Sequence, residues 1–324
     1  MTGGKPALWI VAVGASAGLL ALVVVQVDMP AARQLVRETD YAWVAAGVAV
    51  LLLEGLVTAL RFRLLARGRV RLRDALRATA WYVLMLIGLP ARLGEIAGIG
   101  AIARYLHEPV GVAAASLLFQ RVFDMLMLII LLAIVAVLAV AGEQLFVVLV
   151  VSSVLALLFT AVVVFIEPLL TAVAVRLRPR RHEKWSRLVL RVLLQARMYS
   201  RHHMSGERLL KLGALTACKW TANLLGIALV VVAVVPAMTA ATALGLGIVY
   251  NLSAVIPVQT VGGFGISEVV LLGSFRLLGY ELGVGAPIAI AIRMALISAP
   301  VLFWSLVLTL IPMLPRARVA SRTT

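Results

Sequence analysis

The sequence of 324 residues has little charge and almost no cysteine. Only 14% of its residues are Asp, Glu, Lys or Arg, whereas 63% are hydrophobic, a balance that a water-soluble domain could not bury around an ordinary core. The one cysteine, Cys218, excludes a disulfide framework or a thiolate metal site within the chain, and we interpret it as a helix-packing residue. Lipid must therefore be the solvent for most of the chain.

Hydrophobic runs recur at about 20 residues, the length of helix that crosses a hydrocarbon core of roughly 30 Å. They predict an all-α polytopic membrane protein, with residues 1–324 forming a single transmembrane domain of about six full spans. Lys5 and the Ala-Ser-Ala segment 15–17 resemble a signal peptide, but the apolar run continues beyond them and indicates an uncleaved anchor. The predicted spans are 7–27, 41–60, 122–141, 145–166, 213–235 and 285–311.

Acidic residues are also scarce, since 14 Asp and Glu stand against 30 Lys and Arg. The basic residues gather in the segment 61–77, in the linker 168–212 and after the last span, whereas the connector 28–40 has two arginines against three acidic residues. The positive-inside rule makes the basic segments cytoplasmic, with both termini inside a bacterial-type inner (plasma) membrane. Membrane topology thus accounts for the charge, and we expect no nucleic-acid partner.

Within the basic cytoplasmic linker, residues 181–211 mix apolar and basic side chains at helical spacing. This pattern fits a surface helix on anionic lipid, or a solvated basic loop that only sets the topology. His202 and His203 are adjacent, so on a helix they point about 100° apart and make a poor chelate. We assign no metal to them.

Two apolar stretches, 78–104 and 241–278, cannot each cross the membrane once without reversing the sidedness of the basic segments. Each is interrupted by proline and glycine. Each is predicted to be a re-entrant pair of half-helices, or a pair of short spans, that meet at the break. The residues of the breaks are Pro90, Gly94, Pro257, Gly262, Gly263 and Gly265.

An internal repeat follows from these stretches, because residues 41–141 and 213–312 each read as a span, a broken hairpin and another span. The two units have opposite predicted orientations. Broken hydrophobic segments at matching places in two halves indicate a transporter site near the midplane, and irregular backbone there requires a polar cavity. In each unit a glutamate precedes an arginine by 25 or 26 residues: Glu95 with Arg121, and Glu268 with Arg293.

Ionisable side chains inside apolar segments cost roughly 2.5–3.5 kcal/mol each and need partners. Arg121 and Asp124 are three apart on one helix face, which predicts an ion pair, either structural or part of a site. The glutamates are either helix-start carboxylates or carriers of protons, cations or cationic headgroups, and the arginines would hold a phosphate. The candidate substrate-binding residues are Arg92, Glu95, Arg121, Asp124, Glu268 and Arg293.

Two other charges receive structural interpretations. Lys219, next to Trp220 at the start of a span, is interpreted as an interfacial anchor. Glu54 lies about two turns before Arg61, so its side chain could snorkel toward the cytoplasmic face.

The two broken hairpins resemble those of the lysylphosphatidylglycerol synthase transmembrane-domain family of flippase-like integral membrane proteins. The resemblance covers about residues 40–312 and rests on two ordered motifs. The first is LPARLGE at 89–95 followed by an Arg-x-x-Asp step, and the second is Pro…Gly-Gly-x-Gly-x-x-Glu ending at Glu268. Two departures, Ile87-Gly88 in place of an expected polar residue and Gly98 in place of an expected arginine, leave the headgroup open.

The resemblance implies an inner-membrane protein whose relatives include the domain that translocates aminoacylated phosphatidylglycerol. Others are linked to polyprenyl-phosphate sugar or hopanoid pathways. Because the sequence ends at Thr324, about a dozen residues after the last span, we expect no soluble aminoacyl-transferase domain.

We therefore expect a flippase-like transporter that moves an anionic or zwitterionic lipid headgroup, on a phospholipid, an aminoacyl-phosphatidylglycerol or a polyprenyl-phosphate-linked lipid, between leaflets. The alternatives are a non-catalytic scaffold of a lipid or cell-envelope synthesis complex and an intramembrane lipid-modifying enzyme. We expect no enzyme, because no clustered base, nucleophile or metal ligands are found, and no cofactor. The expected partners are membrane lipids and a separately encoded lipid-synthesis enzyme, and the oligomeric state stays open.

Overall fold

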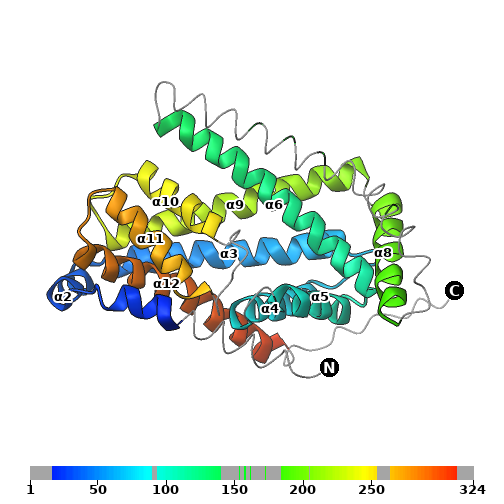
Figure 1. Ribbon diagram of the computed structural model, residues 1–324. Helices are drawn as coiled ribbons and strands as arrows, with labels where there is room; N and C mark the ends of the chain where they lie inside the picture. Colours follow the sequence, from blue (N-terminus) through cyan, green and yellow to red (C-terminus); the bar gives the residue numbers. More distant parts are fainter. Residues whose placement is uncertain are drawn as a thin grey trace.

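The computed structural model describes residues 17–89, 93–139, 184–203, 205–253 and 263–311, with the isolated positions 153, 157, 161 and 172. All the regular structure in these residues is helical, which confirms the all-α prediction (Figure 1). After a short helix at Ala17–Val24 the elements are α2 (Met29–Glu38), α3 (Tyr41–Leu65), α4 (Leu72–Gly88), α5 (Leu93–Tyr105), α6 (Val110–Ala139), α8 (Lys184–His203), α9 (Gly206–Val234), α10 (Ala240–Ser253), α11 (Ile266–Leu277) and α12 (Leu282–Leu310).

Four helices are long and apolar enough to cross a membrane, and they correspond to the predicted spans 41–60, 122–141, 213–235 and 285–311. They are Tyr41–Leu65, Val110–Leu131, Gly206–Val234 and Leu282–Leu310. The chain is thus a polytopic membrane protein.

The two other predicted spans, 7–27 and 145–166, are not among these four helices. The described part of the first is the helix Ala17–Val24, which with α2 forms a pair bent by 88° that could count as a fifth span. The connector expected at 28–40 is therefore mostly helix, with a proline in its first turn, where a missing N–H costs nothing. The span 145–166 lies outside the continuously described residues.

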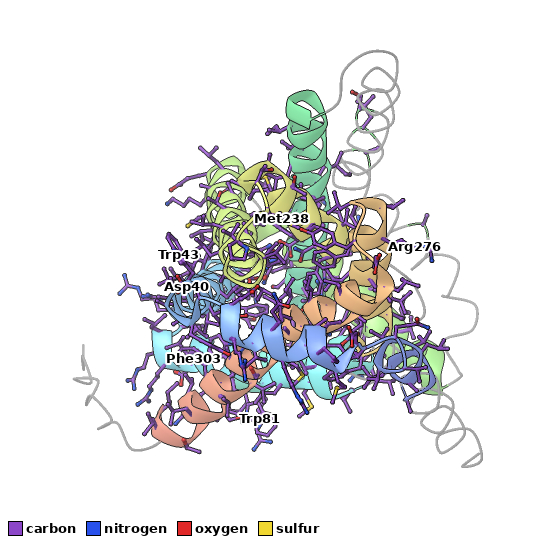
Figure 2. All side chains as sticks on the ribbon, turned by 90° about the vertical axis from the view of Figure 1, so that its left-hand side faces the viewer. Asp40, Trp43, Trp81, Met238, Arg276 and Phe303 are labelled. Atoms are coloured by element: carbon purple, nitrogen blue, oxygen red, sulfur yellow. The ribbon has the colours of Figure 1, made fainter. Side chains whose placement is uncertain are left out.

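The outer surface of the bundle carries large apolar side chains. Leu302 on α12 is 70% exposed, and Leu53 and Leu225 on the central helices are also exposed. Seen end-on, Trp43, Trp81 and Phe303 lie at the periphery of the bundle (Figure 2). Such a surface suits contact with lipid tails rather than with water.

Helices α3 and α9 pack against each other, antiparallel, through the centre of the bundle (Figure 1). At one end of this contact, the backbone N–H of Asp40 donates to the carbonyl of Ala233. Seven residues further along α3, Gly47 faces Gly226. After seven more residues, Glu54 faces Lys219. A seven-residue step keeps one helix face toward its partner, and paired glycines let the two backbones come close. The register therefore carries Glu54 into the interior instead of toward the surface.

The first predicted hairpin is confirmed as a pair of short helices, α4 and α5, packed antiparallel. Gly94 lies against the backbone of Met85 and Leu86, and one turn later Gly98 lies against the Tyr82 ring, so a Cβ at either glycine would collide with α4. At 1.5 Å per residue, the 13 residues of α5 extend only about 20 Å, less than a full span. The predicted break residue Pro90 lies outside the described residues.

The second hairpin joins α10 to α11, and its described end is built on glycine. Gly263 and Gly265 have φ values of 70° and 89°, the left-handed region that glycine adopts without strain. Gly265 caps α11, and its backbone N–H donates to the Glu268 carboxylate at 2.7 Å. Pro257 and Gly262 lie outside the described residues.

Helix α8, formed by residues of the predicted basic linker, lies across one end of the bundle (Figure 1). Tyr199 holds it there by donating to the backbone carbonyl of Leu65 at 2.6 Å, and Gln195 accepts from the N–H of Gly111. Burial raises the pKa of the Tyr199 hydroxyl to about 12, so it remains a donor. Of the two interpretations of this segment, a helix is the one the structure supports.

Apolar side chains form separate clusters in the two halves of the chain. One cluster lies among α3, α4, α5 and α6, and a second lies among α9, α10, α11 and α12 and includes Leu51 of α3. The polar residues described next lie where these two clusters meet.

Candidate functional site

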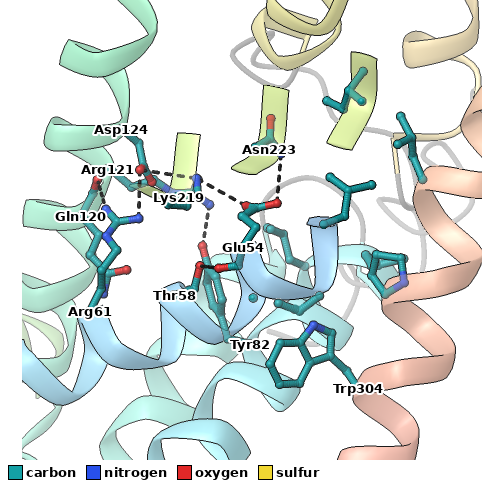
Figure 3. A pocket seen from close by; sticks show the side chains of 18 of the residues that line it. Glu54, Thr58, Arg61, Tyr82, Gln120, Arg121, Asp124, Lys219, Asn223 and Trp304 are labelled. Carbon is teal, nitrogen blue, oxygen red and sulfur yellow. Dashed lines mark hydrogen bonds and ion pairs between the residues drawn. The ribbon is translucent and has the colours of Figure 1, made fainter. Parts of the chain in front are cut away.

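A cavity of about 260 Å³ lies between the two halves, lined by residues of α3, α4, α6, α9, α10 and α12. Figure 3 shows its charged side chains gathered on one side and Trp304 of α12 on the other. The apolar wall includes Leu296 and Pro300 of α12 and Leu86 of α4. The charged side chains of the lining are Glu54, Arg61, Arg121, Asp124 and Lys219.

Asp124 on α6 is the centre of the charged side. Its carboxylate lies 3.0 Å from Nη1 of Arg61 and 3.4 Å from Nζ of Lys219, and Oδ1 accepts from the indole N–H of Trp220 at 3.0 Å. Asp124 is 5% exposed and Arg61 is 1% exposed. A buried carboxylate with three donors from two other helices is stable only as a set, since removing one partner leaves a charge without compensation.

A chain of polar contacts runs from Lys219 along α9. Glu54 lies 3.7 Å from Lys219 and accepts from Nδ2 of Asn223 at 3.0 Å. Asn223 in turn accepts from Asn251 on α10 at 2.8 Å. Lys219 therefore lies between two carboxylates, with its ammonium 4.2 Å from the centre of the Trp220 ring.

Arg121 joins α6 to the first hairpin. Its guanidinium lies 2.9 Å from the carboxylate of Glu95 on α5 and donates to the hydroxyl of Tyr82 on α4 at 2.6 Å. The predicted ion pair between Arg121 and Asp124 is wrong, because each of the two has different partners. Positions three apart on a helix differ by about 60° in direction, enough for Arg121 to face the hairpin and Asp124 to face α3 and α9.

The second hairpin repeats this arrangement. Glu268 on α11 lies 3.6 Å from Nε of Arg293 on α12, and Arg293 donates to the hydroxyl of Tyr250 on α10. The guanidinium also lies over the rings of Tyr250 and Phe264. Glu268 is both a helix-start carboxylate and an ion-pair partner, so the two interpretations of this residue coexist.

Each hairpin thus presents a tyrosine from its first helix and a glutamate from its second helix to an arginine of the following long helix. The glutamate and the arginine that share a spacing of 25 or 26 residues in each unit, Glu95 with Arg121 and Glu268 with Arg293, form ion pairs in the structure, a pairing that the sequence did not predict. The tyrosines, Tyr82 and Tyr250, both line the cavity.

A comparison with protein families gives a match to the lysylphosphatidylglycerol synthase TM region over residues 9–304. The chain belongs to this family. The matched residues contain both motifs on which the predicted resemblance rests. No match was found among curated proteins or among solved structures.

In this family member the sequence predictions missed part of the site. Arg61 counted as one of several cytoplasmic arginines, Glu54 as a snorkelling side chain and Lys219 as an interfacial anchor, whereas all three line the cavity. Asn223 and Asn251 were not considered. The available signal was the seven-residue spacing of Glu54 and Arg61, which places both on one face of α3.

One predicted site residue, Arg92, lies outside the described residues. Within the described ranges, no group of three or more His, Cys, Asp or Glu side chains is placed to hold a metal ion. The described side chains of the site form ion pairs and amide hydrogen bonds around the cavity.

Proposed function

We propose that the protein moves the polar headgroup of an anionic or zwitterionic lipid between leaflets, as a flippase-like transporter without chemical change of the lipid. The observation that carries the proposal is the two-sided cavity inside a membrane bundle. One side is charged and the other is formed by Leu296, Pro300 and Trp304 of α12. A lipid is also two-sided, and its tails can remain among apolar surfaces while the headgroup enters a polar space.

The charged side meets the energetic requirement of such a passage. An ionised group at membrane depth costs several kcal/mol unless partners or a polar lumen receive it. Arginine forks and amide groups can exchange hydrogen bonds with phosphate oxygens as the headgroup passes. Arg121, which lines the cavity and reaches Glu95 on the hairpin, is the side chain best placed to exchange one anionic partner for another.

We propose that the two hairpins act in turn. Tyr82 of the first hairpin and Tyr250 of the second both line the cavity, and each contacts the arginine that pairs with its hairpin's glutamate. Two inverted units of this kind would let the halves rock around a fixed site and expose it to one leaflet and then to the other. This movement would take place in the predicted inner membrane, with both termini on the cytoplasmic side.

The test uses the purified protein in liposomes with tail-labelled fluorescent phosphatidylglycerol in both leaflets, and follows the fraction accessible to an external quencher. We expect faster exchange than in empty liposomes, and loss of most of the acceleration in Arg121→Gln. Lys211→Gln is the control, because Lys211 is an exposed cation outside the cavity, paired with Glu207 one turn away. Equal exchange in Arg121→Gln and Lys211→Gln would reject the site.

A scaffold role is the second candidate, because the buried charges largely neutralise one another, as in a structural network. It would be favoured by co-purification of a lipid-synthesis enzyme together with unchanged exchange in Arg121→Gln. An altered lipid mass after incubation would instead point to an enzyme.

A further inference from the structure

We propose that the protein binds the phosphate of an anionic lipid at a second site, at the arginine-rich end of the bundle. The site is a hollow of about 970 Å³ between the connector that follows α3, the start of α4 and the connector from α5 to α6. None of its lining residues lines the cavity, so the inference is independent of the proposed function. Five arginines line this arginine hollow: Arg67, Arg69, Arg71, Arg73 and Arg77.

The charge of the arginine hollow does not balance when every lining residue is counted. The five arginines face two carboxylates, those of Asp74 and Glu108, which leaves an excess of three positive charges with His107 neutral. The surroundings add to the excess, because Arg104 lies over the Tyr105 ring and the adjoining hollow brings three further cations against one carboxylate. Such a field favours an anionic ligand and disfavours a cationic one.

One ion pair fixes the connector that carries the arginines. Glu108, whose side chain is 6% exposed, accepts from the backbone N–H and from Nε of Arg67, each at 2.7 Å. The two bonds hold the connector against the residues that precede α6. The positive-inside rule depends on the number of positive charges and not on their placement. A connector held in one position therefore points to a site, beyond a signal for topology.

Two arginines of the connector remain available to a ligand. Asp74 lies 3.6 Å from Nε of Arg73 and 3.9 Å from Nη1 of Arg77. Among the residues that the structure describes, neither Arg69 nor Arg71 has a carboxylate within ion-pair distance. Arginine binds phosphate oxygens through two N–H groups at once and keeps its charge. The two side chains therefore suit a phosphate.

His107 adds a polar side chain at a backbone position where glycine would be cheaper. Its φ is 54°, in the left-handed region, and the N–H of Glu108 after it donates to the carbonyl of Ala103 at the end of α5. Glycine is the usual residue at such a helix end. A side chain kept at a strained position points to a use for it, and that of His107 is exposed and lines the arginine hollow.

Apolar residues beside the arginines favour a lipid as the source of the phosphate. Leu72, between Arg71 and Arg73, is 38% exposed, and Val70 lines the arginine hollow. The connectors of a polytopic membrane protein follow its spans, so they lie near the headgroups of the adjacent leaflet. Acyl chains can contact the apolar residues while the phosphate lies among the arginines. A soluble phosphate would gain nothing from them.

The test measures lipid binding to the purified protein in nonionic detergent by native mass spectrometry, with phosphatidylglycerol and phosphatidylcholine of the same acyl chains. We expect phosphatidylglycerol to bind more tightly. In Arg69→Gln, Arg71→Gln its affinity should fall at least about tenfold, because each arginine near an anionic headgroup strengthens binding severalfold. The matched control is Arg33→Gln, Arg37→Gln, which removes two exposed arginines of α2, beyond the other end of α3. Equal affinity of the two double variants would overturn the site.

His107→Gly separates loss of binding from loss of the fold. Glycine adopts a positive φ without strain, so the melting temperature should stay the same or rise. The affinity for phosphatidylglycerol should nevertheless fall by about threefold, because a ligand contact is removed. An unchanged affinity would contradict the role of His107.

Two further arms identify the place and the source of the phosphate. Arg121→Gln, in the cavity, should keep the affinity within about twofold, because distant sites act independently. A loss as large as that of the arginine variants would place the measured lipid in the cavity and overturn the inference. Inorganic phosphate at millimolar concentration should leave the lipid bound. Its displacement of phosphatidylglycerol would assign the hollow to a soluble anion and overturn the choice of a lipid.

Discussion

At the scale of single residues, the site is governed by the cost of an unpaired charge in a low-dielectric interior. Lys219 illustrates this, because it shares its ammonium between Glu54 and Asp124. From sequence it looks like an interfacial lysine, since it follows apolar residues and precedes a tryptophan. Its partners come from α3 and α6, which no local pattern on α9 reveals.

We expect Lys219→Met to destabilise the protein by roughly 3 kcal/mol, the size found when one partner of a buried ion pair is removed. Glu54 would lose its cation, and Asp124 would keep only Arg61 and Trp220. The measurement is reversible unfolding in mixed micelles, followed by tryptophan fluorescence.

Lys211→Met on the same helix is the matched control, because Lys211 is 59% exposed and paired only with a surface glutamate. It should change the unfolding free energy by less than about 0.5 kcal/mol. The double variant Lys219→Met, Glu54→Gln should recover part of the lost stability. Equal stability of Lys219→Met and Lys211→Met would show that the buried network contributes nothing.

At the scale of helices, the first hairpin depends on how closely two short helices approach. Gly94 packs on the α4 backbone at Met85, whereas Gly100, six residues further along α5, has nothing within 4 Å of where a Cβ would be. Glycine is therefore needed for close packing at position 94, whereas at position 100 of the same helix no neighbour requires it.

Gly94→Ala should destabilise the protein by about 1–3 kcal/mol, because the Cβ meets backbone that cannot turn aside. Gly100→Ala should be neutral or stabilise by up to about 1 kcal/mol, because alanine is the better helix former in open space. Both are measured as free energies of unfolding in micelles. Similar effects for the two variants would mean that the close approach of α4 and α5 is not what holds the hairpin.

The hairpins also show how far sequence reasoning reaches. Breaks at proline and glycine are local patterns, and they predicted two helix pairs, which the structure shows as α4 with α5 and α10 with α11. The spacing of a glutamate and an arginine in each unit singled out the right residues, but that they form ion pairs is known only from the structure. The pairing of Arg61 with Asp124 depends on the register of α3 against α6 and α9. That register is a tertiary property, so the cavity and most of its polar wall could not be derived from the sequence.

At the scale of the whole molecule, α3 and α9, the first long helices of the two predicted units, run in opposite directions. The connector after α3 contains Arg69 and lies beside Ser205 at the start of α9, where both line one basic surface hollow. The connector after α9 contains Ala237 and begins next to the start of α3, where Asp40 bonds to Ala233. Connectors at equivalent positions of the two units therefore lie at opposite ends of the bundle.

Opposite ends of a membrane bundle face opposite compartments, and the positive-inside rule predicts that the arginine-rich connector lies in the cytoplasm. In a Cys218→Ser background, Arg69→Cys should react with an impermeant maleimide only after the cells are permeabilised, whereas Ala237→Cys should react in intact cells. Both side chains are exposed, so accessibility does not favour one of them. Labelling of both from the same side would disprove inverted units, and reversed labelling would keep the inversion but reverse the orientation.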